Sequence, residues 1–370
     1  MAGFFDYLYW RGDLSLESSP FNEVDAAMLA RLSYLPFERI IPSDGSEFKE
    51  LPITEAYEKI AAIPGIENML LQSEDLHFLK ELSASGRFGG SVLIDSETVA
   101  DKEVETQFSA ITLRIGKNDL AVSFRGTDST IVGWKEDLNM GFLCPVPAQE
   151  SAAKYLKRTA ARFEGRITVT GHSKGGNLAV FSSAFCGNDA QNRIKNIFNC
   201  DGPGFDERVL KTDGYQSVAQ RITTLVPQSS VVGMLLNHEE KYTIVHSNRT
   251  GLTQHDIYSW EVGRDSFLHL DTVTSSSRFV DKTLKNWMGE MTPAQRESFT
   301  DAIFTVIDGA DVSTLHELGD NWFQSTKGML KSIKGLDEPT RKAVTHTLML
   351  LAKSTGSGLF RMLRQTGQTD

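Results

Sequence analysis

The residues of this sequence best suited to chemistry surround Ser173. Residues 171–175 read G-H-S-K-G, directly after a β-branched run at 167–170 and before a stretch of small residues that starts at Asn177. In the pattern G-x-S-x-G, the serine sits on a sharp turn between a strand and a helix, which lifts its hydroxyl clear of its neighbours. Glycine is needed on both sides, because larger side chains would collide across the turn. The pattern therefore predicts Ser173 as a nucleophile.

A histidine must accompany this serine, because a serine hydroxyl attacks only when a base removes its proton. In the chain order typical of such strand–turn–helix serine sites, the histidine comes last, after the final strand. Two histidines stand there, His246 at the end of a predicted strand at 242–245 and His255 in the polar loop that follows. We expect His255 to be the base, because a loop side chain can reach over the edge of the sheet toward Ser173.

The base also needs an acceptor that holds it in one tautomer. The predicted strand at 222–226 is followed by Ser229 and Ser230 and by no carboxylate. Asp201 follows the preceding strand, and its carboxylate can reach the same histidine from a neighbouring strand end. We therefore expect Asp201 to be the acid. A serine-assisted arrangement through Ser230, and a role for Asp256 next to the base, are the alternatives.

The segment around Thr127 is the predicted site of charge stabilisation. Residues 107–115 and 120–124 are two β-rich runs of a predicted hairpin, and the second runs into R-G-T-D at 125–128. Open α/β sheets bind ligands outside the carboxyl ends of their strands, so Thr127 can offer a backbone N–H and a hydroxyl to an anionic oxygen. The helix after Ser173 directs further N–H groups and a partial positive charge to the same place.

Strands and helices alternate through the middle of the chain. After the hairpin, a predicted helix at 149–163 leads into the strand before Ser173, and strands follow at 194–200, 222–226 and 242–245. Each candidate residue then falls just after a predicted strand. This coincidence favours an α/β-hydrolase fold with a mostly parallel central sheet.

Both flanks of this α/β region have helical patterns. Asn22 or Asp25 can cap a first helix, further helices are predicted at 54–62 and 74–82, and the aromatic residues at positions 4–10 are expected to pack this arm onto the main domain. The chain is therefore divided into a helical N-terminal region at 1–90, a hydrolase domain at 91–275 and a helical C-terminal region at 276–370.

The composition argues against several functional classes. The chain has 370 residues and a net charge of −10, and this acidity repels nucleic-acid phosphates and anionic lipid surfaces. The first residues have no signal-peptide pattern, and no apolar run approaches the ~20 residues of a membrane span, so we expect a cytoplasmic protein. Cys144, Cys186 and Cys200 do not have metal-ligand spacing, so free thiols are expected, and neither a metal nor a cofactor is predicted.

Several motifs together resemble a known family. The similarity to the class 3, fungal-type lipases is carried by F-R-G-T at 124–127, Trp134, Asp137, G-H-S-K-G-G-N-L-A at 171–179 and the residues around His255, Tyr258 and Trp260. It covers residues 107–262. The whole chain, with its aromatic N-terminal arm, resembles more closely a bacterial family of lipase-like α/β hydrolases of unassigned function.

The resemblance implies a role for four residues. Ser173 would be the nucleophile, His255 the base, and the backbones of Thr127 and Lys174 the oxyanion donors. Two departures stand out. Ser230 occupies the position of the lipase aspartate, and Lys174 replaces an apolar residue, which makes a triglyceride substrate less secure.

The sequence thus predicts a serine hydrolase that cleaves carboxylic esters, small or lipid-derived, through an acyl-enzyme. A thioesterase or amidase that uses the same site is one alternative. The other is a catalytically silent binding module with a hydrolase fold, which the missing carboxylate after 222–226 suggests. The loop-rich segment at 128–148 is either a lid or a surface connection.

Overall fold

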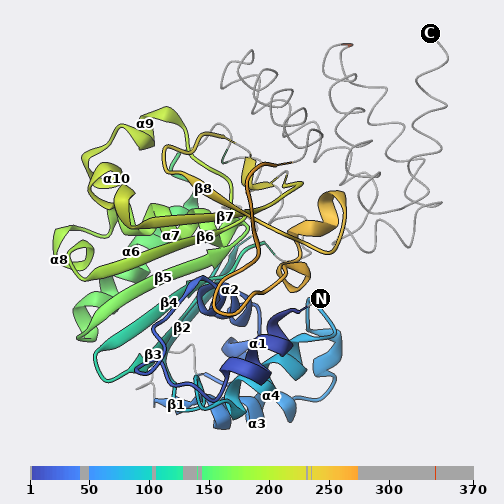
Figure 1. Cartoon of the computed structure of the whole chain (residues 1–370). Helices are drawn as coiled ribbons and strands as arrows, with labels where there is room; N and C mark the ends of the chain where they lie inside the picture. The colour runs from blue at the N-terminus through green and yellow to red at the C-terminus, as the bar shows by residue number, and fades with distance from the viewer. Residues whose placement is uncertain are drawn as a thin grey trace.

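A mixed sheet of nine strands runs through the protein, and each strand lies beside the next one in sequence (Figure 1). The computed structural model describes residues 2–41, 50–101, 106–127, 140, 144–230, 232–234, 236–273 and 338. The strands are β1 Leu51–Pro52, β2 Val92–Asp101, β3 Thr106–Gly116, β4 Asp119–Phe124, β5 Arg166–His172, β6 Ile194–Cys200, β7 Ile222–Pro227, β8 Tyr242–Val245 and β9 His269–Leu270. The predicted hairpin and the predicted strands at 194–200, 222–226 and 242–245 are therefore confirmed.

The expectation of a mostly parallel sheet is wrong. Strands β4 to β8 are parallel, whereas β1 to β4 pair antiparallel and β9 pairs antiparallel with β8. The long strand β2 accounts for much of the difference. Its second half, from Ser96 to Asp101, is partly or fully exposed, so the sequence there lacks the apolar alternation that would reveal a strand.

Helices between the parallel strands share one face of the sheet (Figure 1). When parallel strands lie side by side in the order of the sequence, right-handed crossovers between them all pass over the same face of the sheet. Along β4, Val122 accordingly belongs to the core that includes Tyr155 and Leu178, whereas its neighbour Ala121 belongs to the core on the other side. The helices of this face are α6 Pro147–Arg162, α7 Lys174–Phe185, α8 Asn188–Gln191, α9 Glu207–Leu210 and α10 Asp213–Val218.

The N-terminal helices supply the cover that the other face needs. Helix α2 (Glu23–Leu32) lies across the parallel strands, where the Ser123 hydroxyl donates to the Leu29 carbonyl at 2.8 Å and the Thr170 hydroxyl donates to that of Ala26 at 2.9 Å. Asn22 caps α2 as predicted, since its side chain accepts from the N–H of Val24 at 2.9 Å. The N-terminal helices are α1 Phe4–Arg11, α2 Glu23–Leu32, α3 Ile53–Ala61 and α4 Asp75–Ala84, with short 3-10 turns η1 Phe37–Arg39 and η2 Ile66–Asn68.

Only part of the aromatic arm is packed. Phe4 and Tyr7 are buried in the core beneath α2 and α4, as expected. Tyr9 is 91% exposed and Trp10 is 40% exposed, so these two side chains do not hold the arm in place. On an eight-residue amphipathic helix, one face meets the core and the other meets solvent.

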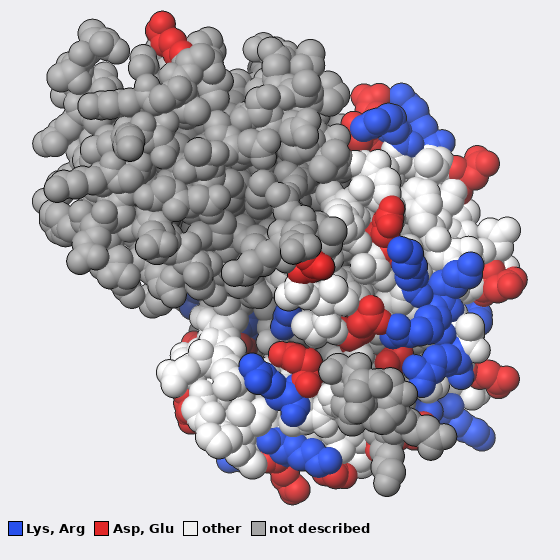
Figure 2. Space-filling model, turned by 180° about the vertical axis from the view of Figure 1, so that it is seen from behind, with Lys and Arg blue, Asp and Glu red and all other residues white. Residues whose placement is uncertain are grey.

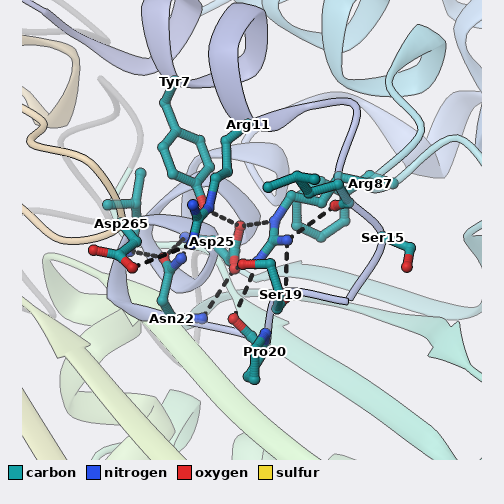
Figure 3. Close-up of polar contacts among 12 residues, drawn as sticks. Tyr7, Arg11, Ser15, Ser19, Pro20, Asn22, Asp25, Arg87 and Asp265 are labelled. Atoms are coloured by element: carbon teal, nitrogen blue, oxygen red, sulfur yellow. Dashed lines mark hydrogen bonds and ion pairs between the residues drawn. The ribbon is translucent and has the colours of Figure 1, made fainter. Parts of the chain in front are cut away.

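A buried polar cluster joins the first helices to the segment after α4 (Figure 3). Arg87 Nε donates to Asp25 Oδ1 at 2.7 Å, and a second guanidinium nitrogen binds the other carboxylate oxygen. Tyr7 donates to Asp25 at 3.0 Å, and the Arg87 guanidinium also donates to the backbone carbonyl of Ser19. The side chains of Arg87 and Asp25 have no solvent exposure. The buried charges of Arg87 and Asp25 therefore neutralise each other within the cluster.

Exposed charges are arranged differently. Figure 2 shows basic and acidic side chains interspersed over the described part of the face opposite to that of Figure 1. On α6, Arg158 pairs with Asp95 at 3.2 Å and with Glu97, while roughly two fifths of the arginine side chain remains exposed. Such pairs contribute little to stability. Among the described residues, no helix is both long enough and apolar enough to cross a membrane.

We predict that Asp25→Asn destabilises the fold by about 3–5 kcal/mol, because it leaves the Arg87 charge buried without its counter-ion. Urea unfolding measures the loss. The matched control is Asp119→Asn, which breaks a two-bond pair with Arg166 at the surface and should cost less than about 1 kcal/mol. Equal losses in the two variants would contradict this account.

Candidate active site

Ser173 stands on a strained turn between β5 and α7. Its φ of 59° and ψ of −134° lie where a residue with a side chain is rarely found. A Cβ on Gly171 would lie 2.0 Å from the Gly175 carbonyl oxygen, and one on Gly175 would lie 2.1 Å from that of Phe124. The steric reason predicted for these glycines is thus present. The turn is tightly packed, and the serine keeps 8% of its surface exposed.

The chain after β4 runs against this turn. A Cβ on Gly126 would lie 2.5 Å from the His172 carbonyl oxygen and 3.0 Å from Ser173 Cβ. Thr127 follows directly. Lys174 is the first residue of α7, and the N–H groups in the first turn of a helix are outside its repeating hydrogen bonds. Both predicted oxyanion residues are therefore neighbours of Ser173 in space or in sequence.

The Lys174 side chain turns away from the exterior. Its ammonium donates to the backbone carbonyl of Gln107 at 2.8 Å and to the side-chain oxygen of the same residue at 3.0 Å. Only 1% of Lys174 is exposed. The charge of the Lys174 ammonium, at a position where an apolar residue was expected, is thus bound by Gln107 at the start of β3.

Asp201 and His255 meet at the same edge of the sheet. His255 Nδ1 donates to Asp201 Oδ2 at 2.7 Å, although the residues are 54 positions apart. Ser173 is held beside them, because its N–H donates to the carbonyl of Cys200 at 2.9 Å. Asp201 also has a positive φ of 53°, a conformation that aspartate tolerates better than most residues. The sequence-distant candidates therefore come together at the ends of β5 and β6.

Further donors surround the Asp201 carboxylate. Its side chain is 1% exposed, and Oδ1 accepts from the Ser230 hydroxyl at 2.5 Å and from the Gly233 N–H at 3.1 Å. A buried carboxylate is stable only when such partners replace water. Ser230, an alternative to Asp201 in the sequence, is thus a donor to the carboxylate and does not replace it.

His172 contacts the backbone of His255. Its Nε2 faces the carbonyl oxygen of His255 at 2.8 Å, so this nitrogen carries the proton, and Nδ1 accepts from the Tyr34 hydroxyl at 3.2 Å. Burial lowers the pKa of His172 well below its usual value, and the nearby charge of His255 lowers it further. His172 is therefore neutral at pH 7.

The loop that carries His255 is also anchored to the N-terminal helices. It consists of two short turns, η5 Gly251–His255 and η6 Ile257–Ser259. The Tyr258 hydroxyl donates to Asp75 at 2.9 Å, and Arg31 Nε donates to the same carboxylate at 2.7 Å. The Arg31 and Asp75 side chains are almost fully buried. The position of His255 thus depends on residues far outside the α/β region.

The remaining candidates point elsewhere. His246 Nδ1 lies 3.0 Å from Glu261, a pair separate from Asp201. Asp256 binds Arg249 at 2.5 Å and caps η6 through the N–H of Tyr258, so it does not hold the His255 ring. Trp134, Asp137 and most of the segment at 128–148 lie outside the described residues, as does the region at 276–370 apart from residue 338, although 147–148 already belong to α6.

Three contributors were not predicted from the sequence. Tyr34 lies 138 positions before His172, Gln107 lies 67 before Lys174, and Gly233 lies 32 after Asp201. None of them belongs to a local motif. Of the three, only Gly233 carries a signal, as a glycine in the turn after β7.

We predict that Gly175→Ala destabilises the protein by about 1–3 kcal/mol, because its methyl group would strike the backbone of Phe124 and Arg125. Thermal and urea unfolding measure the effect. Gly90→Ala is the control, since a Cβ there meets nothing within 4 Å, and it should change stability by no more than about 0.5 kcal/mol. A Gly175→Ala variant as stable as the parent would contradict the packing described for the turn.

Comparison with known proteins gives one family. A family model described as Mbeg1-like matches residues 82–305, which is more than half of the chain. The match begins in α4, covers β2 to β9 and includes Ser173, Asp201 and His255. A search of curated proteins found no match. The chain belongs to the Mbeg1-like family.

Proposed function

We propose that this protein is a serine hydrolase of the α/β-hydrolase fold that cleaves carboxylic esters through an acyl-enzyme. Ser173 is the nucleophile, His255 the base and Asp201 the acid. The observation that carries the proposal is the 2.7 Å contact between His255 and the buried Asp201, beside a serine on a strained turn. Membership of a lipase-like family supports the same class of reaction.

The contact with Asp201 determines what His255 can do. A carboxylate only accepts hydrogen bonds, so Nδ1 of His255 carries its proton and Nε2 keeps a lone pair. As Ser173 Oγ bonds to the acyl carbon, Nε2 takes the hydroxyl proton and the carbonyl oxygen becomes anionic. The backbone N–H groups of Thr127 and Lys174 stabilise this oxygen.

The second half of the reaction reverses the proton transfer. Nε2 gives its proton to the alcohol oxygen as the carbon–oxygen bond breaks, which leaves the acyl group on Ser173. A water molecule then attacks the acyl carbon while His255 takes its proton, and the carboxylic acid leaves as the Ser173 hydroxyl regains a proton. Thioesters and amides would follow the same route with a different leaving group.

A silent binding module remains the second candidate for one reason. Within the described residues, the Ser173 hydroxyl makes no hydrogen bond, although catalysis requires one to His255 Nε2. Catalytic contacts in enzymes without substrate are often long and tighten on binding. Covalent labelling separates the two candidates, because only an activated serine reacts.

We predict that a fluorophosphonate labels the protein at one residue, as Ser173 Oγ bonds to phosphorus and fluoride leaves. Ser173→Ala should abolish labelling and lower ester hydrolysis by about a millionfold, the loss typical of a serine nucleophile. Intact-protein mass spectrometry measures the adduct. Ser182→Ala, on the same helix, is the control and should label like the parent. Labelling of Ser173→Ala at the parent's rate would refute the proposal.

We also predict that Asp201→Asn lowers the labelling rate by about 10⁴-fold, because an amide no longer fixes the reactive tautomer of His255. Asp256→Asn is the matched control. It changes the carboxylate next to His255 in sequence, and it should reduce the rate less than about tenfold, since Asp256 binds Arg249 instead. Similar losses in the two variants would show that Asp201 has no special role.

A further inference from the structure

A second buried histidine–carboxylate pair lies behind Asp201. His238 Nδ1 is 3.0 Å from Glu240 Oε1, and the side chains are 6% and 5% exposed. His238 Nε2 is 2.8 Å from the backbone carbonyl oxygen of Gly233. The N–H of this same Gly233 donates to Asp201. One residue therefore connects the two pairs.

Glu240 is held in its ionised form. Burial alone would raise the pKa of this carboxyl group, but hydrogen bonds from His238, Thr224 and Tyr215 outweigh burial and lower its pKa to about 2. Thr224 donates to Oε1 at 2.6 Å and Tyr215 donates to Oε2 at 2.5 Å. At neutral pH, Glu240 thus presents a fixed negative charge to His238.

Both ring nitrogens of His238 then face acceptors. Nδ1 meets an ionised carboxylate, and Nε2 meets a carbonyl oxygen, so each contact is a hydrogen bond only if that nitrogen carries a proton. A neutral imidazole has one N–H and would satisfy one contact. The geometry therefore fits a doubly protonated, positively charged ring.

Gly233 transmits this arrangement to the site. A Cβ at this position would lie 2.3 Å from Asp201 Oδ1 and 3.0 Å from the Ser230 hydroxyl, so the absence of a side chain lets the backbone reach the carboxylate. Its N–H lies 3.1 Å from both of these oxygens. The carbonyl that faces His238 and the N–H that reaches Asp201 belong to the two peptide units that meet at the Gly233 Cα, so a contact that holds the first unit also restricts where the second can lie.

We propose that His238, charged and paired with Glu240, is a positioning residue for the acid: it fixes Gly233, whose N–H helps to hold Asp201 against His255. This inference rests on the proposed function. This role of His238 explains how Asp201, which directly follows β6, is held by a residue that follows β7. The family resemblance leads one to expect the carboxylate itself after β7.

The test measures the rate of fluorophosphonate labelling of the full chain at pH 8. His238→Gln should lower this rate about ten- to a hundredfold, the loss expected when hydrogen bonds of a charged group disappear. Glu240→Gln should lower the rate in the same direction, because His238 loses the carboxylate that holds its ring. Both variants should also shift the downfield proton NMR signal of His255 Nδ1–H, which reports the hydrogen bond to Asp201 and which a loss of stability alone would not move.

His246→Gln is the matched control, because His246 faces Glu261 at the same 3.0 Å and has no contact with Asp201 among the described residues. It should leave both the labelling rate and the His255 Nδ1–H signal unchanged. If His238→Gln does not fold, Glu240→Gln decides, since it keeps the side-chain volume. An unchanged rate and an unchanged signal in these variants, with Ser173 still labelled, would overturn the inference and leave the proposed function intact. A parent that does not react would overturn both.

Discussion

The candidate site depends on one buried carboxylate. Asp201 lies at the end of β6 with its side chain 1% exposed, and such a charge persists only where several donors replace water. Here the three donors come from two separate parts of the chain: His255 from the loop after β8, and Ser230 and Gly233 from the segment after β7. The need to satisfy this charge therefore draws the ends of neighbouring strands together around Ser173.

The strand order has a second consequence for the site. Because sequential right-handed crossovers put α6 to α10 on one face, the opposite face of the parallel strands must be covered by something else. The N-terminal region covers it, and this region then reaches the site directly. Tyr34 binds His172, and Asp75 binds Tyr258 in the loop that carries His255. An element recruited to bury apolar surface thus also orients polar residues.

Much of this arrangement is readable from the sequence where the signals are local. The G-x-S-x-G turn, the Asn22 cap and the strands before Asp201 and Ser229 each depend on neighbours within a few residues, and each is found as predicted. The choice of Asp201 over Ser230 or Asp256 stayed open, because all three stand near predicted strand ends. Only the hydrogen bond between His255 and Asp201, which are 54 positions apart, distinguishes Asp201 from the other two.

Other features escape sequence reasoning for physical reasons. The antiparallel half of the sheet includes β2, whose exposed second half has no periodic apolar pattern. The roles of Tyr34, Gln107 and Gly233 arise from contacts between distant segments, which no local spacing encodes. Lys174 has the expected place directly after Ser173, but its side chain binds Gln107, a contact that depends on how β3 meets α7.

The most direct test of the central claim is a crystal structure of the protein after reaction with a fluorophosphonate. We predict phosphorus bonded to Ser173 Oγ, the phosphoryl oxygen within hydrogen-bonding distance of the N–H groups of Thr127 and Lys174, and His255 Nε2 beside Ser173 Oγ while Nδ1 keeps its contact with Asp201. A phosphorus atom on another residue, or a His255 ring turned away from a modified Ser173, would contradict the account.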